Sequence, residues 1–153
     1  MRQLDENIIH FFQAQSSVVV ATVDKDGFPH TACKGIVKIE ESGRVYLLDA
    51  YHGQTFNNLK QNPLISITAF NEHKFIGYCL KGKAHLIHKD ELDKKIIRSW
   101  EDRITGRLTQ RLLKNIHDEN GHKGHPEASL PKPKYMIVLE VSEVVDLTPT
   151  HLK

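Results

Sequence analysis

The chain of 153 residues has few of the features that mark specialised classes of protein. It has two cysteines, one tryptophan, a formal net charge of only +2 and no long apolar run. The small charge excludes a nucleic-acid scaffold and a polybasic membrane anchor. No apolar segment approaches the roughly 20 residues of a membrane span, and the charged N-terminal segment is unlike a signal peptide. We therefore expect a cytoplasmic protein without a membrane partner.

The two cysteines, Cys33 and Cys79, both lie in apolar stretches that are typical of strands. In a reducing compartment such thiols are usually packed as small hydrophobic groups rather than bridged. A chain of this length also buries enough surface to fold without disulfides. We predict free cysteines and a single domain over residues 1–153.

Histidine is the residue that the sequence has in excess, with 10 copies. Three of them, His117, His122 and His125, flank or lie in a Gly- and Pro-rich stretch over 118–134 that is typical of a loop. Their spacing matches no established zinc pattern, and no cysteine or clear carboxylate completes the set. A metal site and a solvated loop are the two alternatives, and we favour the loop and predict no metal.

Alternating apolar residues predict six strands, and apolar residues at four-residue spacing predict helices. The strands are expected at 17–23, 28–39, 44–48, 64–70, 75–88 and 135–141, and the helices at 4–13, 53–61 and 89–117. The first three strands follow one another through tight turns, which requires antiparallel pairing. Gly77 and Gly82 suggest bulges or sharp bends of the kind needed at a barrel corner. The predicted fold is an α+β domain built on a small antiparallel six-stranded barrel with flanking helices.

The junction between the third strand and the second helix is the most informative stretch for chemistry. A strand ends near Asp49, a short loop contains Tyr51 and His52, and a helix starts at Gln54 and Thr55. The free N–H groups of a helix start attract anions, and Lys34 or Lys38 on the neighbouring strand offers positive charge. A phosphate is the simplest ligand for such a site. The alternative is an ordinary strand-to-helix connection, because every helix start has free N–H groups.

Several fragments occur here in an order that is more specific than any one of them. They are Ala21-Thr22-Val23-Asp24 with Gly27 and Pro29, then Lys34-Gly35, then the run from Gln54 through Thr55, Asn58 and Leu59 to Asn62-Pro63. Over roughly residues 15 to 90 this order resembles the flavin-binding core of the pyridoxamine 5′-phosphate oxidase-like family, the FMN-binding split barrels. The resemblance implies a split barrel and a homodimer with FMN at the subunit interface.

The resemblance also implies which residues hold the cofactor. The strand around Cys33, Lys34, Gly35 and Ile36 would lie along the flavin, and the junction would hold the ribityl chain and phosphate. The implied cofactor-binding residues are Cys33, Lys34, Gly35, Ile36, Asp49, Tyr51, His52, Gln54, Thr55 and Asn58. Gln54 departs from the family pattern, which has a basic residue there, so Lys34, Lys38 or His52 would have to compensate for the lost charge.

The implied activity is that of an FMN-dependent oxidoreductase acting on an unidentified small molecule. Flavin chemistry needs no protein nucleophile, which agrees with the lack of a convincing catalytic triad. The chain ends without the substrate-holding segment of the vitamin B6 oxidases, so we do not expect that activity. A non-catalytic carrier, store or sensor of flavin or haem is the alternative.

Two further features have competing interpretations. Trp100 lies on the apolar stripe of the long helix, where a core position is favoured over contact with a flavin. Lys81, Lys83 and His85, together with Lys34 and Lys38, form a basic strip on predicted strands. A strip of this kind binds single-stranded nucleic acid only when aromatic residues accompany it, so we predict solvated lysines and no nucleic-acid partner.

Overall fold

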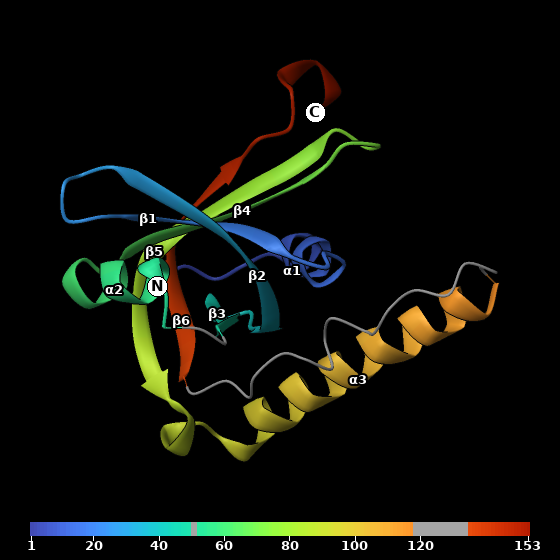
Figure 1. Cartoon of the computed structure of the whole chain (residues 1–153). Coiled ribbons are helices and arrows are strands. Elements are labelled where there is room, and N and C mark those ends of the chain that lie inside the picture. Colours follow the sequence, from blue (N-terminus) through green and yellow to red (C-terminus); the bar gives the residue numbers. More distant parts are fainter. Residues whose placement is uncertain (50–51, 118–134) are drawn as a thin grey trace.

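The computed structural model describes residues 1–49, 52–117 and 135–153, and Figure 1 shows the arrangement of its elements. The helices are α1 (Glu6–Gln13), α2 (Gln54–Gln61) and α3 (Lys94–His117), with 3-10 turns η1 (Lys89–Glu91) and η3 (Thr150–Leu152). The strands are β1 (Val18–Val23), β2 (Pro29–Ile39), β3 (Arg44–Asp49), β4 (Leu64–Asn71), β5 (Ile76–His88) and β6 (Tyr135–Asp146). Tyr51 and residues 118–134, which include His122 and His125 and were predicted as a loop, lie outside the described residues.

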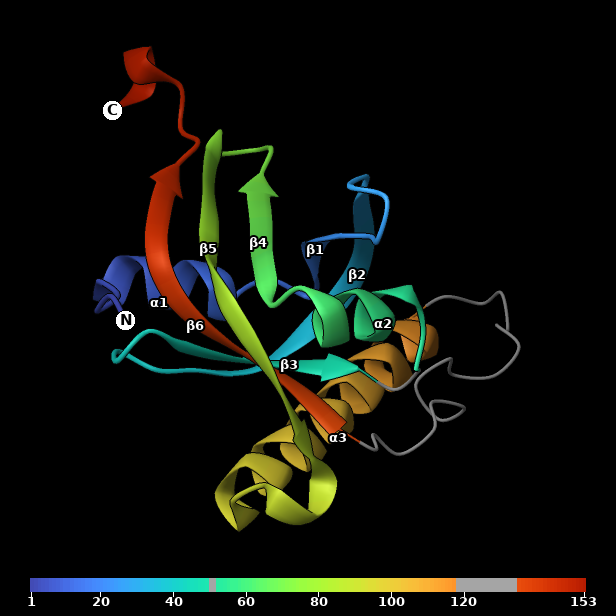
Figure 2. The same cartoon turned by 90° about the vertical axis from the view of Figure 1, so that its left-hand side faces the viewer.

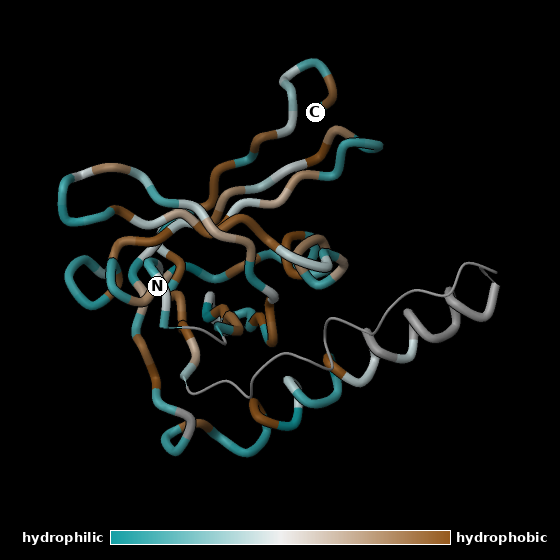
Figure 3. Tube along the Cα trace, in the orientation of Figure 1, coloured by the Kyte–Doolittle hydropathy of each residue, from teal (hydrophilic) through white to brown (hydrophobic). Residues whose placement is uncertain are grey.

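The six strands form a closed barrel in the order β1-β2-β3-β6-β5-β4, and every pairing between neighbours is antiparallel. This confirms the predicted α+β barrel. The ends of β4, β5 and β6 project beyond the closed part of the barrel, and α2 and α3 lie near its other end (Figure 2). Hairpin tips are hydrophilic and strand centres are hydrophobic along the chain trace (Figure 3).

Two predicted boundaries were wrong, one because of strand pairing and one because of a local helix cap. The strand expected to end at Val141 continues to Asp146, because a register shift opposite Lys81 and Gly82 lets β6 keep pairing with β5. The helix expected from Lys89 is broken before α3, where the Asp93 carboxylate accepts a hydrogen bond from the backbone N–H of Lys95 at 2.9 Å. An aspartate in this position caps a new helix rather than continuing the old one.

Of the two glycines expected to mark bulges, only Gly82 does so. A Cβ atom at Gly82 would lie 1.9 Å from the carbonyl oxygen of Glu140, so this close approach of two backbones requires glycine. The pairing of Gly77 with Phe70 is part of a regular ladder, so Gly77 marks no bulge in the pairing of β4 with β5, and a bend there stays a prediction.

The barrel interior and the outer face beneath α3 form two separate hydrophobic clusters. Inward-pointing strand residues pack with Leu4, Ile8 and Phe12 from the N-terminal segment and α1. On the outer face, α3 packs Ile96 and Trp100 against β2, β3 and β6 (Figure 1). The core interpretation of Trp100 is therefore confirmed. The outer cluster contains Val37, Tyr46, Ile96, Met136 and Val138, with Leu48, Ile87, Leu92 and Trp100 half-buried against it.

Both cysteines are free, as predicted, but their packing differs. Cys79 is half-buried, whereas Cys33 is exposed because it points outward from β2. Within 1–49, 52–117 and 135–153, none of the helices has the length and apolar character to cross a membrane. The cytoplasmic location stays a prediction.

Candidate functional site

A row of three polar side chains crosses the barrel where β3 ends. Gly35 pairs with Leu48, which sets Lys34 of β2 opposite Asp49 of β3, and Asp49 pairs directly with Tyr135 of β6. The Lys34 Nζ lies 2.9 Å from Asp49 Oδ2, and these side chains are only 10% and 4% exposed. The hydroxyl of Tyr135 donates a hydrogen bond to the same carboxylate oxygen. The register therefore places a buried ion pair with a hydroxyl donor at the end of the barrel.

Burial explains the electrostatics of this row. Desolvation and the neighbouring Asp49 carboxylate both raise the pKa of Tyr135 far above its usual value near 10, so its hydroxyl keeps its proton. A buried carboxylate is tolerated only when it is paired and hydrogen-bonded, and Lys34 and Tyr135 supply both requirements. Lys34 is thus the counter-ion of Asp49. The prediction that Lys34 belongs to a solvated strip with Lys81 and Lys83 was wrong.

His52 connects this row to the start of α2. Its ring stacks on the ring of Tyr135 with centroids 5.1 Å apart, and it packs against Phe56 at 4.5 Å. Phe56 also meets Tyr135 edge to face at 4.8 Å. Two rings, Phe56 from α2 and Tyr135 from β6, thereby hold the imidazole of His52 just before the first turn of α2. Phe56 and Tyr135 were not predicted, because only the register of β6 reveals that Tyr135 reaches the junction.

The N-terminus of α2 is open to a ligand. Gly53 is its N-cap, no side chain caps the helix, and the first turn contains no acidic residue. Gly53 is exposed, and a Cβ atom placed on it would contact nothing within 4 Å. Free N–H groups at such an end favour an anion. Thr55, by contrast, is buried in the first turn.

Gln54 and Asn58 secure α2 to the barrel. The Gln54 Nε2 donates to Asn58 Oδ1 at 2.7 Å, and Asn58 Nδ2 donates to Thr22 Oγ1 on β1 at 3.0 Å. Asn58 and Thr22 are both fully buried, so this chain of hydrogen bonds satisfies polar groups that would otherwise destabilise the core. The side chains of Gln54 and Asn58 therefore hold α2 against β1 through these hydrogen bonds.

The remaining predicted residues lie along β2 and are not gathered into one pocket. Cys33 is exposed, Gly35 is half-buried, and Ile36 belongs to the barrel core. A narrow gap lined by Gly35, Ile36, Leu48 and Trp100 separates β2 and β3 from α3. The outer backbone of β2 is therefore open near Cys33 and covered near Gly35.

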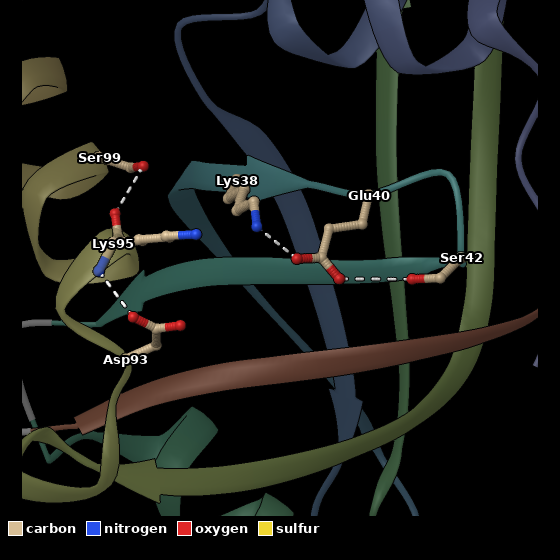
Figure 4. Close-up of polar contacts among 6 residues, drawn as sticks. All are labelled: Lys38, Glu40, Ser42, Asp93, Lys95 and Ser99. Carbon is tan, nitrogen blue, oxygen red and sulfur yellow. Dashed lines mark hydrogen bonds and ion pairs between the residues drawn. The ribbon is translucent and has the colours of Figure 1, made fainter.

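Lys38, the second predicted cation, is also held by a carboxylate. Figure 4 shows its Nζ directed at Glu40, whose other carboxylate oxygen accepts a hydrogen bond from Ser42. The side-chain hydrogen bond to Glu40 is the main reason that the pKa of Lys38 is raised above its ordinary value. Lys38 is therefore charged and bound within its own hairpin.

A larger hollow lies on the outer side of β1, β4, β5 and β6. This groove of about 560 Å³ has an apolar floor and carries Lys81, Lys83 and Glu143 at its rim. Lys81 of β5 and Glu143 of β6 are direct partners on neighbouring strands, and they form an exposed ion pair at 3.2 Å. Nothing in the linear sequence indicated this groove, because its lining comes from separated strands.

Comparison with known proteins places this geometry in context. An uncharacterized protein of Methanocaldococcus jannaschii is 33% identical over 76 residues, which are 48% of this chain and 50% of that protein, so the chain matches half of its relative's length. A pyridoxamine 5′-phosphate oxidase-like structure from Lactobacillus delbrueckii superposes with a TM-score of 0.65 at 18% identity, covering 95% of both chains. The haem storage protein HutZ of Vibrio cholerae superposes with a TM-score of 0.55 at 19% identity, covering 95% of this chain and 94% of HutZ.

The two structural likenesses show a shared fold. The family model described as pyridoxamine 5′-phosphate oxidase matches residues 4–146, from the segment before α1 to the end of β6. That match includes the buried row, the open N-terminus of α2 and all six strands. The chain belongs to the pyridoxamine 5′-phosphate oxidase family.

Proposed function

We propose that the chain is an FMN-binding flavoprotein that acts as an oxidoreductase on a small molecule. The observation that carries the proposal is the open N-terminus of α2 beside His52, in a chain of this family. Open space at Gly53 and the lack of acidic residues in the first turn suit the phosphate of FMN. The junction thus fits the cofactor at its anionic end.

Each residue of the junction has a definable role in this proposal. The N–H groups of the first turn of α2 and the His52 ring bind the phosphate, and the exposed backbone near Cys33 lies along the flavin. The row of Lys34, Asp49 and Tyr135 keeps the end of β3 and the His52 ring in position. Bound FMN supplies hydride or electron transfer, and the protein supplies orientation and polarity.

A homodimer with the cofactor at the subunit interface is part of the proposal. The outer face of β1 and β4 exposes Val19, Leu64 and Phe70, and Leu147 is exposed just after β6; each of these residues is between 41% and 52% exposed. Several exposed apolar residues on one side of a sheet are consistent with a protein contact. A second copy of the chain would cover these residues.

The test uses two substitutions at Gly53, whose φ of −92° suits any residue. Gly53→Asp caps α2 and places a carboxylate where the phosphate would bind, so we expect at least a tenfold weaker FMN affinity with unchanged or higher thermal stability. Gly53→Ala adds no charge and is the matched control, because its Cβ meets nothing. Equal FMN affinity of the Asp variant and the parent protein would contradict the proposed site.

The second candidate is a non-catalytic carrier, store or sensor of flavin or haem. Structural likeness to HutZ supports this candidate. Reduction of the FMN-loaded protein by NADH or NADPH, followed by reoxidation with an acceptor, favours the enzyme. Bound flavin that no donor reduces, or a Soret band after haem titration with no flavin binding, favours the second candidate.

A further inference from the structure

We propose that the groove on the outer side of β1, β4, β5 and β6 is a second ligand site, which takes a small carboxylate with an apolar body. None of the residues that line the groove belongs to the set predicted to hold FMN. The inference therefore goes beyond the proposed flavin site and does not depend on it. The groove volume of about 560 Å³ lies within the range of about 300–1,000 Å³ that is typical of small-molecule pockets.

Small side chains make the outer face of the sheet hollow at this point. Ala21 pairs with Ser66, and Ser66 pairs with Lys81, so these residues form one row across β1, β4 and β5. Val23 and Leu64 lie two residues further along β1 and β4, so their side chains point to the same face and form an apolar wall. The Ser66 hydroxyl makes no hydrogen bond within the described residues, and it is available to a ligand.

The direction of the groove sets the length of the ligand. Neighbouring strands lie about 4.8 Å apart, so the path from Val23 on β1 across β4 to Lys83 on β5 measures about 10 Å. Two fused aromatic rings, or an alkyl chain of similar length, would cover this path. The apolar end of such a ligand lies on β1 and its polar end lies on β5.

Lys83 supplies positive charge at the polar end of the groove. It is exposed, and it makes no ion pair within the described part of the chain. Its neighbour on β6, Glu140, is paired with Arg44 at 3.7 Å, and Glu143 is paired with Lys81 at 3.2 Å. The two carboxylates are thus balanced by Arg44 and Lys81, and Lys83 adds one further positive charge. An anionic group is the complementary partner for this end.

The experiment titrates the full-length protein by calorimetry with 2-naphthoate and with its neutral analogue 2-naphthalenemethanol, each with and without saturating FMN. Lys83→Met removes the charge, and Lys74→Met, at an exposed lysine between β4 and β5, is the matched control. Because Lys83 is exposed, we expect Lys83→Met to weaken 2-naphthoate binding only about three- to tenfold and to leave the alcohol unchanged. Lys74→Met should change neither affinity.

A second pair of variants tests the space in the groove. Ser66→Phe fills the groove from its floor, whereas Thr68→Phe adds the same ring to the same face of β4 outside the groove. We expect Ser66→Phe to abolish binding of both probes and Thr68→Phe to retain it. Thermal unfolding and FMN titration of each variant report whether the fold and the flavin site are intact.

The results separate this site from the flavin site and from a subunit contact. Loss of the preference for 2-naphthoate in Lys83→Met, with loss of both probes in Ser66→Phe, supports the inference. Parental affinities in either variant overturn it, as does displacement of the probe by FMN. Absence of probe binding overturns it too, and a lower mass of Ser66→Phe by light scattering would then assign the groove to a second copy. Binding of 2-naphthoate by a protein that binds no FMN contradicts the proposed function and leaves this inference intact.

Discussion

Replacing Lys34 by methionine tests whether the buried row at the end of the barrel stabilises the fold. The substitution keeps the length of the side chain but leaves Asp49, which is 4% exposed, without its counter-ion. Breaking a buried ion pair by removing one partner costs about 3–5 kcal/mol. Tyr135 still donates to the carboxylate, so we expect a loss near the lower end, about 3 kcal/mol. That is a large fraction of the stability of a domain of this size.

The double variant Lys34→Met with Asp49→Asn separates lost charge pairing from lost packing. Asparagine removes the buried charge and retains an acceptor for the Tyr135 hydroxyl, so most of the stability should return, to within about 1 kcal/mol of the parent protein. Lys81→Met is the matched control, because its pair with Glu143 is exposed and such pairs contribute about 0–1 kcal/mol.

The assay is urea unfolding followed by circular dichroism and by the fluorescence of Trp100, the only tryptophan in the chain. A single variant Lys34→Met that loses less than about 1 kcal/mol would refute the reasoning, because a buried unpaired carboxylate costs more than that. So would a double variant that is no more stable than the single one. Either result would mean that Lys34 and Asp49 are not coupled in the folded protein.

Three further substitutions test the tyrosine of the buried row and two glycines elsewhere in the structure. Because the pKa of Tyr135 is raised in the folded state, its contribution to stability is present below pH 10 and is lost as the pH rises above 10, where the unfolded tyrosine ionises. Tyr135→Phe should remove that contribution to the alkaline slope and cost about 1–3 kcal/mol at neutral pH in urea unfolding; an unchanged slope would contradict it. Gly82→Ala should cost about 2–3 kcal/mol by thermal unfolding, since its Cβ meets Glu140, whereas Gly106→Ala, with open space in a helix, should gain about 1 kcal/mol. Similar effects at the two glycines would argue against the backbone contact.

Local patterns predicted most of the barrel because each strand carries its own signal. The turn before β2 is an example: the Asp24 side chain accepts from the N–H groups of Asp26 and Phe28, and Gly27 adopts a φ of 87° that favours glycine. Apolar and polar residues alternate along each strand because successive side chains point to opposite faces of the sheet. The turns and strands that depend on neighbours in the sequence were therefore predicted correctly, whereas the local cap at Asp93 that begins α3 was missed.

The buried row was not predictable from the sequence, because register decides it. Lys34 reads as one more strand lysine until the pairing of β2 with β3 sets it opposite Asp49. Tyr135 is separated from Asp49 by 85 intervening residues, so no spacing rule connects them. The extra length of β6 depends likewise on the register shift at Gly82. Tertiary pairing, not local propensity, changed the role assigned to Lys34.

Native mass spectrometry of the purified chain incubated with FMN tests the central claim most directly. The account predicts a dimer carrying two FMN molecules, with binding weakened in Gly53→Asp and retained in Gly53→Ala. A monomer, or a dimer that remains free of flavin at saturating FMN, would contradict it.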